Sequence, residues 1–155
     1  LHPTSGDLSG NDSSCILRVV AGETAVLLTG DAGRGAEGRL AARLGAGLRS
    51  DILVAGHHGS ATASAAPFLD AVAPRYVLYA AGFANRWGFP AAEVRQRVAA
   101  LGAVELDTGS LGAISFRLGP EGLAGPDFYR ARHLRLWTHR PPVVPVPPSA
   151  AFEYD

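Results

Sequence analysis

Short apolar runs alternate along this chain with polar, glycine-rich turns and with stretches of helical spacing. Continuous apolar runs of this length are typical of β-strands buried in a sheet. They predict strands over 15–20, 25–29, 52–55, 76–80, 104–107 and 113–118. Gly22 and Glu23 lie between the first two runs and predict a hairpin turn there.

Apolar residues spaced three or four apart predict a helix in each of three intervals between these strands. The first helix spans 37–44, the second lies between Ser64 and Pro74, and the third runs from Pro90 to Leu101. Ser64 is the predicted N-cap of the second helix, because its hydroxyl can accept a backbone N–H of the first turn. Strands that alternate with short helices indicate an α/β or layered α+β fold.

The composition of the chain changes after residue 118, and we predict a boundary there. Residues 1–118 hold the predicted strands and helices, whereas 119–155 read as a basic-aromatic and Pro-rich C-terminal tail outside the core. Residues 127–140 carry four arginines among aromatic side chains. Such a stretch fits contact with a phosphate backbone, and it fits equally well a peripheral helix whose aromatic side chains are buried.

Length, charge and cysteine content limit the classes of protein to which this chain can belong. With 155 residues, 47% of them hydrophobic, the chain can form one domain with a core. The 14 basic and 14 acidic residues balance, so the overall charge does not indicate a nucleic-acid partner. One cysteine excludes an internal disulfide, and no apolar stretch approaches the roughly 20 residues of a membrane span. The chain contains no methionine and begins at Leu1, so we expect a piece of a larger protein.

Side chains able to bind a metal ion follow two of the predicted strands. Asp31 comes after strand 25–29, and the adjacent His57 and His58 come after strand 52–55 with a glycine on either side. Open α/β sheets build their sites at the carboxyl ends of strands, so the carboxylate and the imidazoles are expected at one sheet edge. Each feature also has a structural interpretation, in which Asp31 stabilises its turn and the histidines are hydrogen-bonded loop residues.

The residues of this sheet edge supply too few ligands for a complete metal centre. Neighbouring residues of a continuing strand face opposite ways, so we expect only one of the two histidines to be a ligand. A carboxylate and an imidazole make two ligands, and catalytic sites of the zinc type need about three. The glycine-rich turn at 30–35 offers phosphate binding as a competing interpretation, although it lacks the spacing of the dinucleotide fingerprint and a P-loop lysine.

Several of these segments, taken in order, resemble the soluble domain of the ComEC family of competence proteins. The matching segments are Asn11 to Ser14, Leu27 to Asp31, Asp51 to Ser60, Phe68 to Tyr76, Asn85 to Pro90 and Gly112 to Ile114. The resemblance implies that 1–118 is the C-terminal portion of a metallo-β-lactamase-like domain, a partial αββα sandwich. It also implies a parent protein for DNA uptake in transformation, located in the bacterial inner membrane, with this domain outside the cytoplasm.

The activity implied by the resemblance is that of a metal-dependent nuclease, a hydrolase that degrades the DNA strand that is not transported. Asp31 matches the family's metal-bridging aspartate, and His57 and His58 match its late histidine motif, with His57 the preferred ligand and His58 the alternative. These three residues are the predicted catalytic group, and Zn or Mn is the implied metal. Four further residues of the matching segments are predicted on the substrate side: Asn11, Ser14, Ser60 and Asn85. The implied partners are single-stranded DNA and the transmembrane channel of the same parent.

The sequence departs from the family pattern in two places. The early cluster of histidine and aspartate ligands would lie upstream of Leu1, so we expect this chain alone to be inactive. Phe89 stands where the family has a histidine in a Gly-His-Pro motif. Two alternatives follow: a catalytically impaired domain that guides DNA or supports assembly, or a small-molecule metallo-hydrolase, because one fold serves many substrates. Half of a sandwich would expose an apolar sheet face, which predicts self-association of the fragment.

Overall fold

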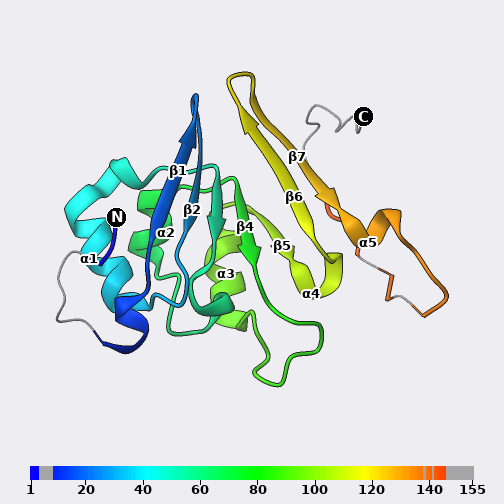
Figure 1. Ribbon diagram of the computed structural model, residues 1–155. Coiled ribbons are helices and arrows are strands. Elements are labelled where there is room, and N and C mark those ends of the chain that lie inside the picture. The colour runs from blue at the N-terminus through cyan, green and yellow to red at the C-terminus, as the bar shows by residue number, and fades with distance from the viewer. Residues whose placement is uncertain (4–8, 138, 141, 146–155) are drawn as a thin grey trace.

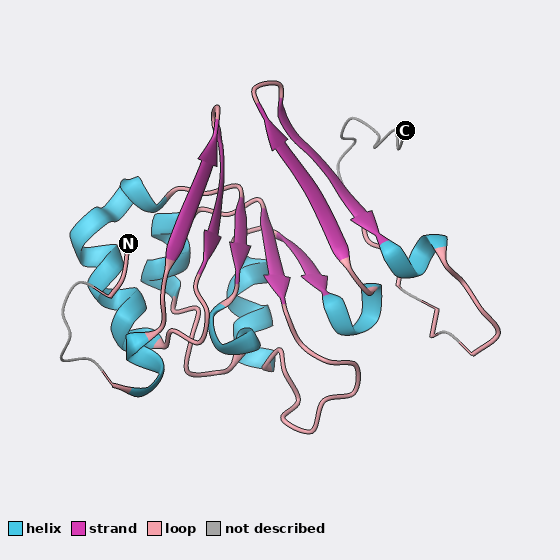
Figure 2. Cartoon of the chain, viewed as in Figure 1, coloured by secondary structure: helices cyan, strands magenta, loops and turns pink. Residues whose placement is uncertain are grey.

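A five-stranded mixed sheet forms the centre of the computed structural model, which describes residues 1–3, 9–137, 139–140 and 142–145 (Figures 1 and 2). Its strands lie in sequence order: β1 (Leu17–Ala21), β2 (Thr24–Leu28), β3 (Ile52–Val54), β4 (Tyr76–Tyr79) and β5 (Val104–Asp107). The first two strands form an antiparallel hairpin, and β2 to β5 are parallel neighbours. The parallel strands therefore all end at the same edge of the sheet.

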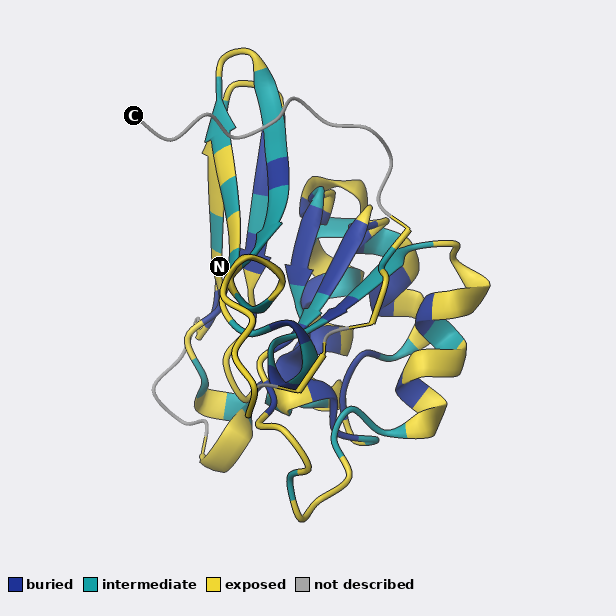
Figure 3. Cartoon of the chain, turned by 90° about the vertical axis from the view of Figure 1, so that its right-hand side faces the viewer, coloured by how far each residue is buried: buried dark blue, intermediate teal, exposed yellow. Residues whose placement is uncertain are grey.

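One face of this sheet is covered by α1 (Arg34–Leu44), α2 (Ala66–Val72) and α3 (Ala92–Ala100). Side chains alternate along each strand, so Leu27, Leu53 and Val77 point into the core under the helices, where they are fully buried. Figure 3 shows how the buried residues gather along the central strands and on the inner sides of the helices. This layering confirms the predicted α/β architecture.

A second hairpin packs on the opposite face of the sheet. It consists of β6 (Ile114–Gly119) and β7 (Gly122–Phe128), reached through α4 (Thr108–Leu111) and followed by α5 (Tyr129–Arg132). The Phe116 ring lies 5.1 Å from that of Tyr76, within an apolar cluster on this face. The change of composition after residue 118 therefore falls inside a hairpin, and part of the segment read as a tail contributes to the second core.

The six predicted strands are all present within two residues of their expected bounds, and the turn at Gly22 and Glu23 is confirmed. Three short 3-10 segments complete the described structure: η1 (Gly10–Ser13), η2 (Gly45–Leu48) and η3 (Gly56–Gly59). Among the described residues, no helix combines the length and the apolar character needed to cross a membrane. The prediction of self-association remains a prediction, although three apolar side chains of the edge strand β1 are exposed: Leu17, Val19 and Val20.

The predicted N-cap of α2 is wrong. Ser64 lies one residue too early, and its hydroxyl has no hydrogen-bond partner among the described residues. The residues that precede α2 are held by Glu37 of α1, whose carboxylate accepts the backbone N–H groups of Ser64 at 2.7 Å and Ala65 at 3.1 Å. A carboxylate from another helix thus holds the two residues that lead into α2, whereas within the described part of the chain no side-chain hydrogen bond caps the first turn of this helix.

Glu37 makes the stability of this fold dependent on pH. Burial raises the pKa of Glu37 above its usual value, against the opposing effect of the two backbone N–H groups and of Arg97 and Arg34. A raised pKa in the folded state means that folding favours the protonated form. The stabilising contribution is therefore complete below the unfolded-state pKa of about 4.3, and it is lost as the pH rises through the raised pKa.

We expect the free energy of unfolding of the native chain to fall relative to that of Glu37→Gln as the pH rises from about 4, because glutamine mimics the neutral carboxyl at every pH. Urea denaturation between pH 4 and 8 measures the difference. Glu93→Gln is the matched control, since Glu93 is exposed on α3. The raised pKa of Glu37 would be contradicted if the difference in free energy of unfolding between the two proteins stays constant with pH. It would also be contradicted if the native chain becomes the more stable of the two as the pH rises.

Candidate functional site

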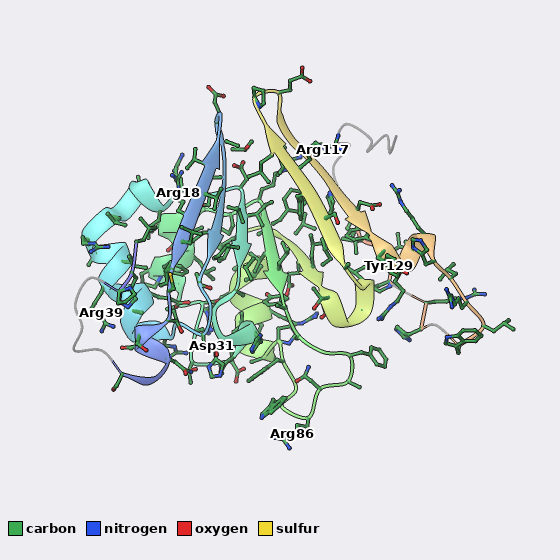
Figure 4. The ribbon with its side chains drawn as sticks, in the orientation of Figure 1. Arg18, Asp31, Arg39, Arg86, Arg117 and Tyr129 are labelled. Carbon is green, nitrogen blue, oxygen red and sulfur yellow. The ribbon has the colours of Figure 1, made fainter. Side chains whose placement is uncertain are left out.

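Three loops meet where the parallel strands end. Asp31 follows β2, His57 and His58 follow β3, and the loop of residues 80–90 follows β4, at the lower edge in Figure 4. They enclose a cavity of about 590 Å³. Its lining consists of Asp31, His57, His58, Ala80, Ala81, Gly82, Asn85, Trp87 and Phe89. The predicted meeting of the carboxylate and the histidine pair at one edge is therefore present.

The two histidines occupy a strained turn and not a continuing strand. Their φ angles are +48° for His57 and +57° for His58, in the left-handed region that costs an L-residue roughly 1–2 kcal/mol. Gly59 follows at φ +84°, and a Cβ there would lie 2.7 Å from the Tyr79 ring and 2.8 Å from Pro90. The turn places both imidazoles on the cavity, so the expectation that the rings face opposite ways fails. Strain of this kind is concentrated at functional sites.

His58 and Asp31 lie next to each other in the lining of the cavity. His58 Nε2 lies 3.5 Å from Asp31 Oδ1, and both side chains are about half exposed. On the other side of the ring, His58 Nδ1 lies 2.9 Å from the carbonyl oxygen of Ala80. A carbonyl only accepts, so Nδ1 carries a proton, and in the neutral ring Nε2 turns its lone pair toward the carboxylate.

His57 has a different environment. Asn11 Nδ2 lies 3.2 Å from His57 Nδ1, and an amide nitrogen only donates, so Nδ1 accepts and a neutral ring carries its proton on Nε2. The Phe89 ring packs edge-on against the His57 ring, with the ring centroids 5.8 Å apart. The two adjacent histidines are thus held in opposite tautomers by two different neighbours.

The loop after β4 is held rigidly by Asn85. Its side chain donates to the carbonyl oxygens of Gly82 and Phe89 and accepts the N–H of Phe89. This arrangement fixes the backbone at position 89, whichever side chain the residue carries. The exposed Trp87 ring lies 6.3 Å from that of Phe89 and nearly parallel to it, and the Arg86 guanidinium lies over the indole at 4.5 Å.

The other predicted site residues lie outside the cavity lining. Ser60 is buried, and its hydroxyl hydrogen-bonds that of Thr62. Ser14 lies near Gly30, and its N–H donates to the Asn11 carbonyl. Sequence reasoning missed Trp87 as a lining residue and Ala80 as the group that orients His58. For Trp87, the signal available in the sequence was a tryptophan in the loop after a strand that ends at the same edge.

The competing interpretation of the turn at 30–35 as a phosphate site is not favoured by the structure. The Asp12 carboxylate lies against the first turn of α1, so close that a Cβ at Gly35 would be 2.6 Å from its Oδ2. Asp12 Oδ2 also pairs with Arg39 at 2.9 Å. An acidic side chain thus lies where an anion would bind at this helix terminus.

The donor set fits a divalent cation in kind and falls short in number. A carboxylate oxygen and an imidazole nitrogen are ligands that zinc accepts. A ligating histidine usually donates its other ring N–H to a backbone carbonyl or a carboxylate, which fixes the tautomer and the orientation of the ring. Within the described ranges, however, no group of three or more His, Cys, Asp or Glu side chains could hold a metal ion. Further ligands would have to come from outside these residues.

Comparison of the sequence with models of known protein families finds no match. Individual proteins do match. Competence protein ComA of Neisseria gonorrhoeae is 41% identical over 131 residues, which are 84% of this chain and 18% of that protein. The uncharacterized protein YcaI of Escherichia coli is 31% identical over 88% of the chain and 18% of its own length. Recombination protein 2 of Haemophilus influenzae is 39% identical over 57% of the chain and 11% of its own length.

The first two of these matches cover most of the chain, 84% and 88% of it. The chain spans less than a fifth of the length of each of these relatives. The similarity therefore supports a place for this chain in the competence-protein family, as a segment that matches less than a fifth of such a protein.

Proposed function

We propose that this chain is the C-terminal part of a metallo-β-lactamase-like domain in a DNA-uptake protein of the ComEC type. The complete domain would be a metal-dependent phosphodiesterase that degrades the DNA strand that does not enter the cell. The observation that carries the proposal is the pairing of Asp31 with His58 at the carboxyl edge of a parallel sheet, 3.5 Å apart. The similarity to a protein named for competence supports the biological setting.

The electrostatics of this pair favour a cation between them. Because the proton on Nδ1 is donated to the Ala80 carbonyl, a neutral His58 presents the lone pair of Nε2 to a carboxylate oxygen of Asp31. Two electron-rich atoms at this separation repel each other unless a proton or a metal ion lies between them. The contacts therefore favour His58 as the ligand, whereas the resemblance favoured His57 and left His58 as the alternative.

Each residue of the edge has a distinct proposed role. When bound, a divalent ion such as Zn or Mn supplies a water of lowered pKa and neutralises charge on the phosphodiester. Asp31 and His58 would hold that ion, and the Ala80 carbonyl would keep His58 in the ligating tautomer. His57, with its proton on Nε2, is placed to donate a hydrogen bond to a phosphate oxygen, and Asn11 fixes that tautomer.

The remaining ligands are proposed to come from another segment of the parent protein, which would also supply the transmembrane channel in the inner membrane. This chain alone would then be inactive. The test is to assay the chain and the full-length protein on labelled single-stranded DNA with manganese, with zinc and with EDTA. We expect cleavage only by the full-length protein and only with metal. Robust cleavage by the chain alone, or no cleavage by the full-length protein with either metal, would overturn the proposal.

A second candidate function is supported by one observation, the Phe89 ring packed against His57 inside the cavity. Phenylalanine neither binds a metal ion nor transfers a proton. A domain with this residue could guide DNA without cleaving it. Substitution of Phe89 separates the two functions.

A further inference from the structure

A second groove lies beside the candidate site, on the far side of the loop after β4. It has a volume of about 550 Å³ and is formed by the segment around and after α5, at the right in Figure 4, where Tyr129 is labelled. Its lining consists of Phe83, Tyr129, Arg130, His133, Arg135, Trp137 and His139. All seven side chains carry an aromatic ring or a guanidinium group.

The larger aromatic side chains of this groove, Phe83, Tyr129 and Trp137, are exposed and lie outside the core. The Tyr129 ring stacks on that of His133, with centroids 4.0 Å apart and planes within 14°. Trp137 is 79% exposed, and the Arg135 guanidinium lies 5.8 Å from its ring centroid. Large aromatic groups usually gain stability by burial. Their exposure here beside cations indicates a surface for a ligand that has flat rings and negative charge.

The charge of this segment differs from that of the whole chain. Residues 127–140 contain four arginines and one acidic residue, Asp127, which pairs with Arg132 at 2.7 Å, whereas the complete chain has equal numbers of basic and acidic residues. Arg130 anchors the groove wall, since its guanidinium donates to the carbonyl oxygens of Gly109 and Ser110. A local excess of positive charge on a neutral protein favours an anionic partner at this place.

The groove and the candidate site share one loop. Ala81 and Gly82 line the cavity with Asp31, and the next residue, Phe83, lines the groove, where its ring lies 4.8 Å from that of His139. A chain molecule bound along the groove would therefore lead directly to the cavity. Among anionic chain molecules, a polynucleotide with unpaired bases combines phosphates with exposed flat rings.

We propose that this groove binds single-stranded DNA, with bases stacked on Tyr129 and Trp137 and phosphates near the arginines. The identity of the strand as DNA rests on the proposed function, whereas binding itself needs no metal ion. A base pair hides the faces on which such stacking depends, so a duplex should bind more weakly. The exposed Leu134 and Leu136 make an apolar, membrane-facing surface the competing explanation.

The test measures the binding of a fluorescein-labelled oligo-dT of about 12 nucleotides to the full chain, by anisotropy, in EDTA and about 50 mM salt. Trp137→Leu keeps an apolar side chain and removes the ring face, and we expect it to weaken binding about 5- to 100-fold. Trp137→Phe keeps a ring face and should retain most of the affinity. Leu136→Ala is the control, because Leu136 is fully exposed next to the tryptophan, and it should bind as the native chain does.

The outcomes separate this proposal from its competitors. Equal binding by the native chain and Trp137→Leu, tighter binding to a duplex of the same length, or binding to anionic vesicles that Leu136→Ala weakens would each overturn it. Cleavage by the full-length protein together with no binding by this chain would defeat the groove and leave the nuclease proposal standing. Binding of the oligonucleotide by this chain, together with no cleavage by the full-length protein, would leave the groove standing and defeat the nuclease proposal.

Discussion

Asp31→Asn in the full-length protein is expected to lower the rate of metal-dependent DNA cleavage by at least about 100-fold. Stabilisation of charge by a bound metal ion contributes several kcal/mol to such reactions, and each 1.36 kcal/mol is a factor of ten. Asparagine keeps the size of the side chain and removes the charge. Because the Asp31 side chain is about half exposed, the substitution should leave the fold intact. Single-turnover cleavage of labelled DNA at saturating manganese measures the effect.

The two histidines provide an internal comparison for this prediction. His58→Gln should reduce both cleavage and metal affinity as strongly as Asp31→Asn, because Nε2 of His58 is the atom that faces the carboxylate. His57→Gln should reduce cleavage while leaving the metal dissociation constant unchanged. Asp70→Asn on α2 is the matched control, since Asp70 is exposed and outside the cavity lining. Loss of metal binding in His57→Gln but not in His58→Gln would reverse the assignment.

The sheet and its functional edge were predictable because they depend on local patterns. Each inner strand is a short apolar run whose alternate residues meet the two packed faces, as Leu53 and Ile52 do in β3. The position of Asp31 beside the histidine pair follows from the parallel pairing of β2 and β3, since parallel strands end at a common edge. Residue types at strand ends were therefore sufficient to predict that Asp31 and the histidines lie at one edge of the sheet.

The orientation of the two imidazoles was not predictable from the sequence. It depends on a left-handed turn that is held by contacts distant in the chain, such as the packing of Gly59 against Tyr79 and Pro90. The tautomer of each ring is likewise fixed by a distant group, the Ala80 carbonyl for His58 and the Asn11 amide for His57. A local pattern carries no information on such neighbours, and the choice between the two histidines depended on them.

Strand β7 was missed for a different reason. It contains Gly122, Gly125 and Pro126, which normally weaken or interrupt a strand, and its pairing with β6 changes register between Ser115 and Arg117. The period-two pattern on which strand prediction depends is therefore broken. The contact of Glu37 with the residues before α2 escaped prediction as well, because Glu37 lies on another helix, 27 residues earlier in the chain than Ser64.

Phe89→His is expected to raise the affinity of this chain for Zn²⁺ by about tenfold or more. The Phe89 ring lines the cavity with Asp31 and both histidines, and the three hydrogen bonds of Asn85 to the loop fix the backbone at this position. An imidazole in the same place supplies a third nitrogen or oxygen donor, the number that catalytic zinc sites use. Isothermal titration of the chain with Zn²⁺ measures the gain.

The same substitution in the full-length protein decides between cleavage and guidance of DNA. A positioned histidine also adds acid–base catalysis, which contributes about 100-fold or more, so we expect faster cleavage by Phe89→His than by the native protein. Arg86→His is the control, because Arg86 is exposed on the same loop and outside the cavity lining. If Phe89→His and the native protein cleave at equal rates, Phe89 is no impairment, and the guidance function loses its main support. If only Phe89→His cleaves, the native domain guides DNA without cleaving it, and Phe89 is the residue that prevents cleavage.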